Sequence, residues 1–183
     1  QEVKEEDWAE SWKEHHHRIQ ITESLAVSPP WEAEEGDLIV PPGNAFGTGE
    51  HPSTFECLRK IAFLAENTSS CLDVGCGSGI LALAAAKLGL RARGIDIDAP
   101  SVASAKENAL LNRLKVPFST DDIRSIQDEF DLVVANLFAE VLVDLAEELL
   151  RVSSKHLVLA GILNEKADRV LEALYPMKLV ERI

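Results

Sequence analysis

The sequence predicts an α/β fold in which a mostly parallel sheet is covered by helices on both faces. From Cys71 onward, short apolar runs alternate with longer segments that carry apolar residues every three or four positions. The short runs are almost continuously apolar, as expected of strands that are buried on both faces. Strands and helices that alternate in this way join through right-handed crossovers into one parallel sheet.

Six short apolar runs are the predicted strands. They are "CLDV" (71–74), "RARGI" (91–95), "VPF" (116–118), "LVVA" (132–135), "LVLA" (157–160) and "KLVERI" (178–183). The apolar spacing predicts one helix that begins at Ile80 and another from Phe138 to Leu149. An earlier helix is predicted from "GEHPST" to about Ala65, with Pro52 in its first turn.

The chain divides in this interpretation into an acidic extension, residues 1–43, and a main domain, residues 44–183. Trp8 and Trp12 lie four residues apart and predict a short helix in the extension. "LIVPP" (38–42) predicts a strand that the two prolines end.

Composition argues against several classes of protein. A formal net charge of −13 repels a phosphate backbone, so we expect no direct nucleic-acid contact and a basic protein as partner. There is no run of eighteen apolar residues and no basic, apolar leader, so we expect no membrane span and a cytoplasmic protein, which we take to be a monomer. Cys57, Cys71 and Cys76 lie in apolar segments without CxxC spacing, which favours reduced thiols over a metal site.

The glycine-rich stretch "DVGCGSG" (73–79) follows the first strand of the main domain and predicts a cofactor loop. Gly75 and Gly77 would let the backbone approach a ligand closely. The GxGxG spacing differs from the GxGxxG of dinucleotide folds, and Asp73 would disfavour a pyrophosphate but stabilise an ammonium or sulfonium. Asp96 ends the second strand, where an acid can accept hydrogen bonds from ribose hydroxyls. The loop therefore predicts S-adenosyl-L-methionine, and a class I methyltransferase core of the Rossmann-like type.

Acidic residues after the third strand complete the predicted cofactor site. Asp121 or Asp122 is placed to accept a hydrogen bond from the adenine amino group, and Ile123 or Ile97 to pack on the ring. Simple capping of a helix N-terminus explains these aspartates equally well.

The fourth strand, in "FDLVVANLFAE", ends on Asn136. An uncharged amide there can accept a hydrogen bond from a target amine without adding charge beside a sulfonium. The position is similar to the asparagine of the (D/N)PPY motif of amino-directed methyltransferases, although Leu137 and Phe138 replace its prolines. The alternative is that Asn136 caps the next helix.

Several stretches together resemble one family. They are "NAFGTGEHPST" (44–54), "LDVGCGSGILALAAAKLG", "GIDIDAPSVASAKENALLN", "DLVVANLFAEVL", "LAGIL" and, upstream, "EEDWAESWKEHHH". They are similar to the bacterial methyltransferases of large-subunit ribosomal protein L11, the PrmA family, over about Glu5 to Leu174. The resemblance implies cofactor contacts at Thr54, Gly75, Asp96 and Asn136, with Phe46, Gly47 and His51 near the cofactor or the amine.

The chain departs from that family in two places. The family has an N-terminal substrate-recognition domain, of which only the acidic linker region is expected here. The family core also ends in a strand hairpin, and the sequence is expected to lack its final strand, because it ends at Ile183.

The resemblance implies transfer of a methyl group from S-adenosyl-L-methionine to lysine or N-terminal amino groups of a basic, large-subunit ribosomal protein. Such a displacement needs mainly proximity and orientation, with an uncharged amine. Asn136 would orient the amine, and His51 would either accept its proton or shape the start of the helix. The alternatives are methylation of another protein or a small molecule, cofactor binding without catalysis, and an NAD-dependent oxidoreductase that shares Asp96.

Overall fold

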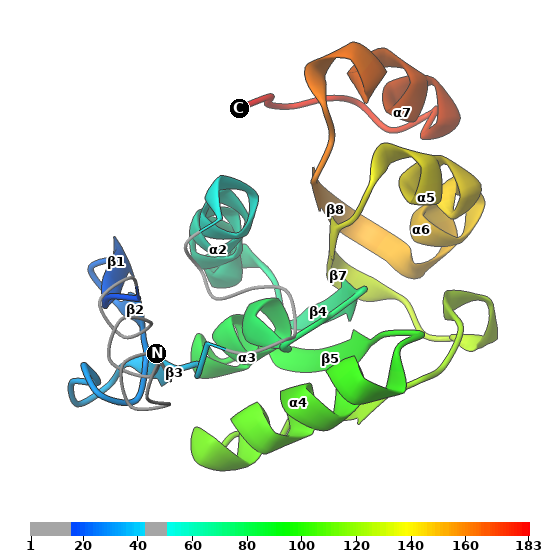
Figure 1. Cartoon of the computed structure of the whole chain (residues 1–183). Helices are drawn as coiled ribbons and strands as arrows, with labels where there is room; N and C mark the ends of the chain where they lie inside the picture. The colour runs from blue at the N-terminus through cyan, green and yellow to red at the C-terminus, as the bar shows by residue number, and fades with distance from the viewer. Residues whose placement is uncertain (1–15, 43–50) are drawn as a thin grey trace, which may run out of the picture.

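The computed structural model describes residues 16–42 and 51–183. Its main body is a five-stranded sheet of order β6-β5-β4-β7-β8 in which every neighbouring pair is parallel (Figure 1). The strands are β4 Ser70–Val74, β5 Arg91–Ile95, β6 Phe118–Ser119, β7 Phe130–Asn136 and β8 Ser153–Ala160. The α/β fold with a parallel sheet is thus confirmed.

Helices cover both faces of this sheet. They are α2 Pro52–Leu64, α3 Ile80–Lys87, α4 Ala99–Leu111, α5 Ala139–Asp144, α6 Ala146–Val152 and α7 Ala167–Ala173, with 3₁₀ turns η1 Ala65–Asn67, η2 Ile123–Ser125 and η3 Asn164–Lys166. In β7, Leu132 and Val134 join the core beneath α2, α3 and α4, whereas Val133 and Ala135 join the core beneath α5, α6 and α7. Because side chains alternate along a strand, β7 is buried on both sides.

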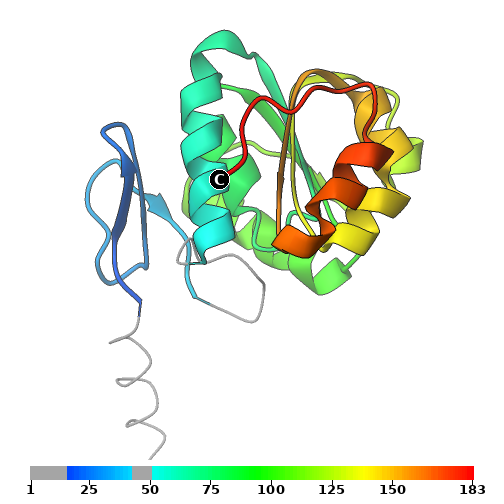
Figure 2. The same ribbon diagram turned by 90° about the horizontal axis from the view of Figure 1, so that it is seen from above.

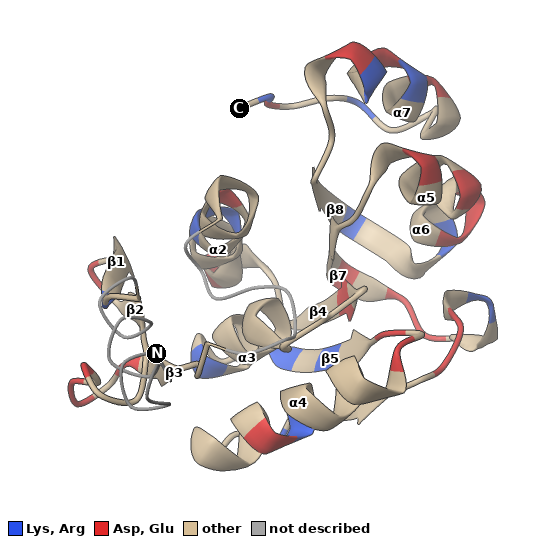
Figure 3. Cartoon of the chain, viewed as in Figure 1, with Lys and Arg blue, Asp and Glu red and all other residues tan. Residues whose placement is uncertain are grey.

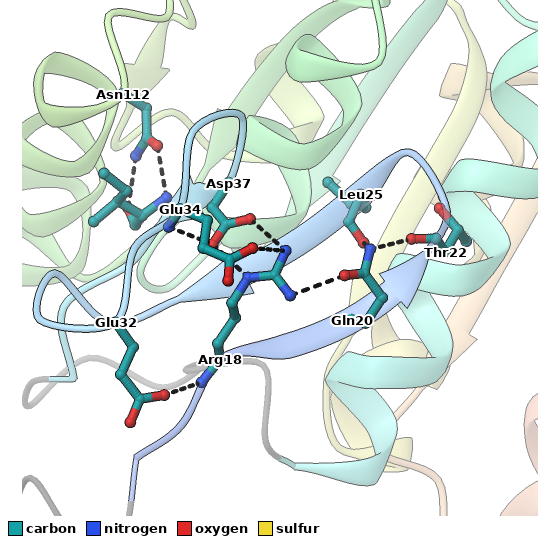
Figure 4. A network of polar contacts seen from close by, with 9 residues as sticks. Arg18, Gln20, Thr22, Leu25, Glu32, Glu34, Asp37 and Asn112 are labelled. Carbon is teal, nitrogen blue, oxygen red and sulfur yellow. Dashed lines mark hydrogen bonds and ion pairs between the residues drawn. The ribbon is translucent and has the colours of Figure 1, made fainter.

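A small second sheet lies beside the main body, next to α2 (Figure 2). Its strands are β1 Ile19–Thr22, β2 Leu25–Ser28 and β3 Leu38–Ile39, of which β1 and β2 are antiparallel and β2 and β3 are parallel. The Arg18 guanidinium donates to both oxygens of Asp37, at 2.8 and 3.0 Å, and so ties the start of β1 to the residue before β3 (Figure 4). Asn112 joins this sheet to the end of α4, because its side chain both accepts from and donates to the backbone of Ile39.

Three sequence-based expectations about elements need correction. Residues 178–183 form no strand. Glu181 instead pairs with Lys60 of α2, and Arg182 donates to Asn164. Val180 is 96% exposed, so the segment does not lie on a sheet edge. The single helix predicted over residues 138–149 is two helices, α5 and α6, that share one continuous buried face. The strand predicted at 116–118 begins later in the structure, as β6 at Phe118, because Pro117 has no N–H that could bond to a neighbouring strand.

The sequence pattern does not predict the β1–β2 hairpin, and β3 occupies only part of the predicted 38–42 strand. The predicted helix around Trp8 and Trp12 lies outside the described residues. Within 16–42 and 51–183, the structure contains no helix that is both long and apolar enough to cross a bilayer.

Candidate functional site

The carboxyl ends of the parallel strands bring most of the predicted site residues to one edge of the sheet. Ligands of open α/β sheets bind at this edge. The glycine loop follows β4, Asp96 follows β5, Asp121 follows β6 and Asn136 ends β7. We call this set the carboxyl edge. Phe46 and Gly47 lie outside the described residues.

The glycine loop is fixed to the end of β5 by backbone hydrogen bonds. The amides of Gly75 and Cys76 both donate to the Ile95 carbonyl, at 2.9 and 3.0 Å, and Gly77 donates to the Asp96 carboxylate at 2.8 Å. Gly75 and Gly77 have φ values of +74° and +51°, a region that side chains other than glycine rarely adopt. The loop is therefore held in one shape by its own backbone.

Asp73 lies beneath this loop and is 1% exposed. Its Oδ2 accepts a hydrogen bond from the Ala82 amide of α3 at 3.1 Å, and its Oδ1 has no hydrogen-bond partner among the described residues. Burial, together with the neighbouring Asp96 carboxylate, raises the pKa of Asp73 to about 7, although the Ala82 bond opposes the change. A buried acceptor without a partner is costly, so this oxygen is suited to a cationic or hydrogen-bonding ligand group.

The Asp96 carboxylate accepts hydrogen bonds from the glycine loop and from the residues that follow β5. Besides Gly77, the Asp98 amide donates to its other oxygen at 2.9 Å. The next residue, Ile97, is 89% exposed, whereas Ile123 is 3% exposed and belongs to the core. Of the two isoleucines considered for packing on an adenine ring, only Ile97 is thus accessible at the carboxyl edge.

The two aspartates after β6 have different environments. Asp121 accepts from Arg93 at 2.7 Å and from Ser119 at 2.6 Å, and these groups lower its pKa. Asp122 is the N-cap of η2 and accepts from the Arg124 amide at 2.9 Å. Helix capping therefore explains Asp122 but not Asp121.

The Asn136 side chain is held by Thr54, a residue of α2 on the same face of the sheet. Its Nδ2 donates to the hydroxyl of Thr54, which is 1% exposed, at 3.3 Å. Its Oδ1 accepts no hydrogen bond from any described residue. Asn136 does not cap the following helix, because the N-cap of α5 is Phe138. This bond restricts rotation of the Asn136 amide.

His51 is the N-cap of α2. Its Nδ1 accepts from the Ser53 amide at 3.3 Å and lies 2.7 Å from the Ser53 hydroxyl, and its side chain is exposed. These contacts give it a structural role at the start of the helix that carries Thr54.

Sequence reasoning missed the contacts of Leu137. Its side chain packs against Gly75, where a Cβ would overlap it, and a Cβ at Gly161 would lie 2.6 Å from its carbonyl oxygen. Gly161 has a φ of +81° and follows β8, so its position in the sequence was a weak signal of this close approach. Leu137 thereby links the glycine loop to the end of β8.

The three cysteines are buried: Cys57 is 1%, Cys71 0% and Cys76 5% exposed. Burial raises the pKa of Cys57 to about 12 and raises those of the other two further. Their thiols are therefore packing groups in the protein interior rather than nucleophiles.

The sequence of this chain matches one family of known proteins. A model of the family described as ribosomal protein L11 methyltransferase (PrmA) matches residues 1–181. The ribosomal protein L11 methyltransferases of Geotalea uraniireducens and Geotalea daltonii are 42% and 45% identical, over 98% and 96% of this chain. The chain spans only 65% and 63% of the length of these two relatives.

A solved structure of a protein with the same described activity as these relatives also matches the chain. The crystal structure of a ribosomal protein L11 methylase from Lactobacillus delbrueckii subsp. bulgaricus matches with a TM-score of 0.79 and 32% identity, and the match covers 87% of both chains. The fold is that of the Rossmann-like class I methyltransferases. Within that class, the chain belongs to the ribosomal protein L11 methyltransferase (PrmA) family, which confirms the resemblance found in the sequence.

Proposed function

We propose that this chain is the catalytic part of an S-adenosyl-L-methionine-dependent methyltransferase that acts on amino groups of a basic ribosomal protein in the cytoplasm. The relatives named above are methyltransferases of ribosomal protein L11, which makes that protein the first substrate to test. The observation that carries the proposal is the Asn136 amide, which Thr54 holds at the carboxyl edge together with the glycine loop and Asp73, and whose Oδ1 has no hydrogen-bond partner in residues 16–42 and 51–183.

The residues present fit the cofactor. The buried Asp73 carboxyl supplies an acceptor near the glycine loop, because its Oδ1 has no hydrogen-bond partner among the described residues. Asp96 supplies a carboxylate for ribose hydroxyls, and exposed Ile97 supplies an apolar surface for the base. When bound, S-adenosyl-L-methionine supplies an electrophilic methyl group and leaves as S-adenosyl-L-homocysteine.

The chain's own residues would orient the amine. The nitrogen forms a bond to the methyl carbon as the carbon–sulfur bond breaks, and the nitrogen loses one proton to solvent. A lysine amine has an ordinary pKa of about 10.4 and an α-amino group one of about 7.7 to 8.0, so the nitrogen must first be deprotonated. Asn136 Oδ1 accepts a hydrogen bond from the neutral amine and directs its lone pair, while Thr54 prevents the amide from rotating.

Substitution of Asn136 tests this function. In Asn136→Ala, we expect kcat for methylation of ribosomal protein L11 to fall by roughly a hundredfold, because the amine loses its orienting group. Thr54→Val should lower kcat in the same direction, and Thr54→Ser, which keeps the hydroxyl, should retain most activity. Transfer from labelled S-adenosyl-L-methionine measures kcat, and calorimetric titration with S-adenosyl-L-homocysteine measures cofactor binding.

The exposed Asn67 offers a matched control, because Asn67→Ala removes an amide that forms no hydrogen bond among the described residues. Full methyl transfer by Asn136→Ala would contradict the role given to Asn136. A thermal shift with NAD but not with S-adenosyl-L-homocysteine would contradict the proposed cofactor. If another protein or a small molecule were labelled and L11 were not, the proposed cofactor would stand and the proposed substrate would be wrong.

A further inference from the structure

Phe138 occupies a position that neither folding nor packing explains. It is the N-cap of α5 but makes no side-chain capping bond, although serine, threonine, aspartate and asparagine are strongly preferred at N-caps. Its side chain is 77% exposed, so it adds little to the core. Departures from local sequence rules without a structural gain are typical of functional sites.

The alternation of β7 shows which way Phe138 faces. Leu132 and Val134 face the core beneath α2, whereas Val133 faces the opposite core. Leu137 packs with that opposite core. Phe138 itself has extended backbone, with φ −63° and ψ 146°. Continued alternation from Asn136 would place its side chain on the side of the sheet that carries Asn136 and Thr54.

Two further exposed apolar side chains belong to the same region. Val141, 39% exposed, lies in the first turn of α5, three residues beyond Phe138 in the sequence. Leu163, 58% exposed, follows β8, and an ion pair between Glu140 and Lys166 brings its segment alongside the start of α5. We call Phe138, Val141 and Leu163 the apolar rim.

We propose that the apolar rim binds the aliphatic part of the amine-bearing substrate side chain and the residues beside it, with Phe138 as the main contact. This inference rests on the proposed function, because it assigns the substrate-facing surface of the same site. An aromatic face attracts an arriving ammonium group, and apolar surroundings favour the neutral amine that methyl transfer requires. The rim continues directly from Asn136 along the chain, which places the substrate side chain next to the amide that orients its nitrogen.

Substitutions of Phe138 test whether the apolar rim contacts the substrate, with another exposed phenylalanine as the control. In Phe138→Ala, we expect the KM for ribosomal protein L11 to rise roughly tenfold, while Phe138→Leu retains part of the affinity. Phe138→Ser introduces a favoured N-cap residue, so its melting temperature should equal or exceed that of wild type while transfer still falls. Phe63→Ala, on α2 with 74% exposure, is the matched control and should leave the KM unchanged.

Transfer kinetics and S-adenosyl-L-homocysteine titration on the full chain separate the outcomes. A raised KM in the Phe138 variants, with cofactor affinity within about twofold of wild type, supports the rim. Equal KM values for Phe138→Ala, Phe63→Ala and wild type would overturn it and leave the proposed function intact. A wild-type protein that binds the cofactor but labels no L11 would overturn both the L11 assignment and the rim that rests on it.

Discussion

Asp73 is a buried carboxyl group whose titration should be visible in the stability of the protein. Its ordinary pKa is 3.8, and burial raises it to about 7 in the folded chain. Between these two values the folded state binds a proton that the unfolded state has released, so the free energy of unfolding decreases as the pH rises. The decrease ends above the folded pKa, where both states are ionised, and amounts to a few kcal/mol, on the order of 1.4 per pKa unit.

Asp73→Asn should remove this pH dependence. Because asparagine stays neutral, we expect the variant to be more stable than wild type above pH 7 and to bind S-adenosyl-L-homocysteine and S-adenosyl-L-methionine more weakly. Urea unfolding at a series of pH values without cofactor measures the first effect, and titration calorimetry the second. The exposed Asp144→Asn serves as the control. An unchanged pH profile in Asp73→Asn would show that another group is responsible.

The positions of the candidate site residues differed in how far the sequence could indicate them. That Asp73 and Asp96 lie beside the glycine loop could be predicted, because their distance from it follows from strand geometry. The hydrogen bond from Asn136 to Thr54 joins residues 82 positions apart and depends on how α2 packs over the sheet. The overlap of Leu137 with Gly75 depends in the same way on close packing, which has no periodic signature in sequence.

Elements were predictable where a regular pattern of burial specified them. The central strands are apolar on both faces, so their composition identified them without any tertiary information. Residues 178–183 have the composition of a strand but no strand partner in this structure, and composition alone does not supply one. The α5–α6 break at Leu145 is not marked by glycine or proline, so the apolar spacing indicated one helix.

Asn112 at the end of α4 should control how firmly the small sheet is attached. Its side chain accepts from the Ile39 amide at 2.7 Å and donates to the Ile39 carbonyl, the two dashed lines at Asn112 in Figure 4. It also donates to the carbonyl of Asn108. Asn112→Ala removes these bonds, so we expect a loss of about 1–3 kcal/mol in the free energy of unfolding. Hydrogen exchange should accelerate most at the amide of Ile39, with little change in β4.

The exposed Asn67→Ala again provides a matched amide deletion for this experiment. Equal acceleration of exchange in the small sheet and in β4 would indicate general destabilisation rather than release of one element. Unchanged protection at Ile39 would mean that packing of β1 and β2 on α2, through residues such as Leu25 and Leu58, is sufficient to hold the small sheet.

For the whole molecule, the net charge of −13 is the property that bears most on a basic partner. Acidic residues lie along α5 and α6 and on the segment that leads into β7, while basic residues interrupt β5 (Figure 3). A negative electrostatic potential raises the rate of encounter with a positively charged protein. Salt screens this potential, with a screening length of about 10 Å at 0.1 M. We therefore expect kcat/KM for ribosomal protein L11 to fall several-fold as ionic strength rises from about 0.05 to 0.5 M.

That fall should reside in KM, because kcat at saturating substrate reflects the desolvated site, where salt has little effect. A short uncharged peptide with a free amino terminus is the control substrate, and its kcat/KM should change little over the same salt range. Steady-state transfer of labelled methyl groups measures both substrates. A salt-independent kcat/KM for L11 would mean that short-range contacts, such as those proposed for Phe138, rather than the overall charge, govern how the substrate is captured.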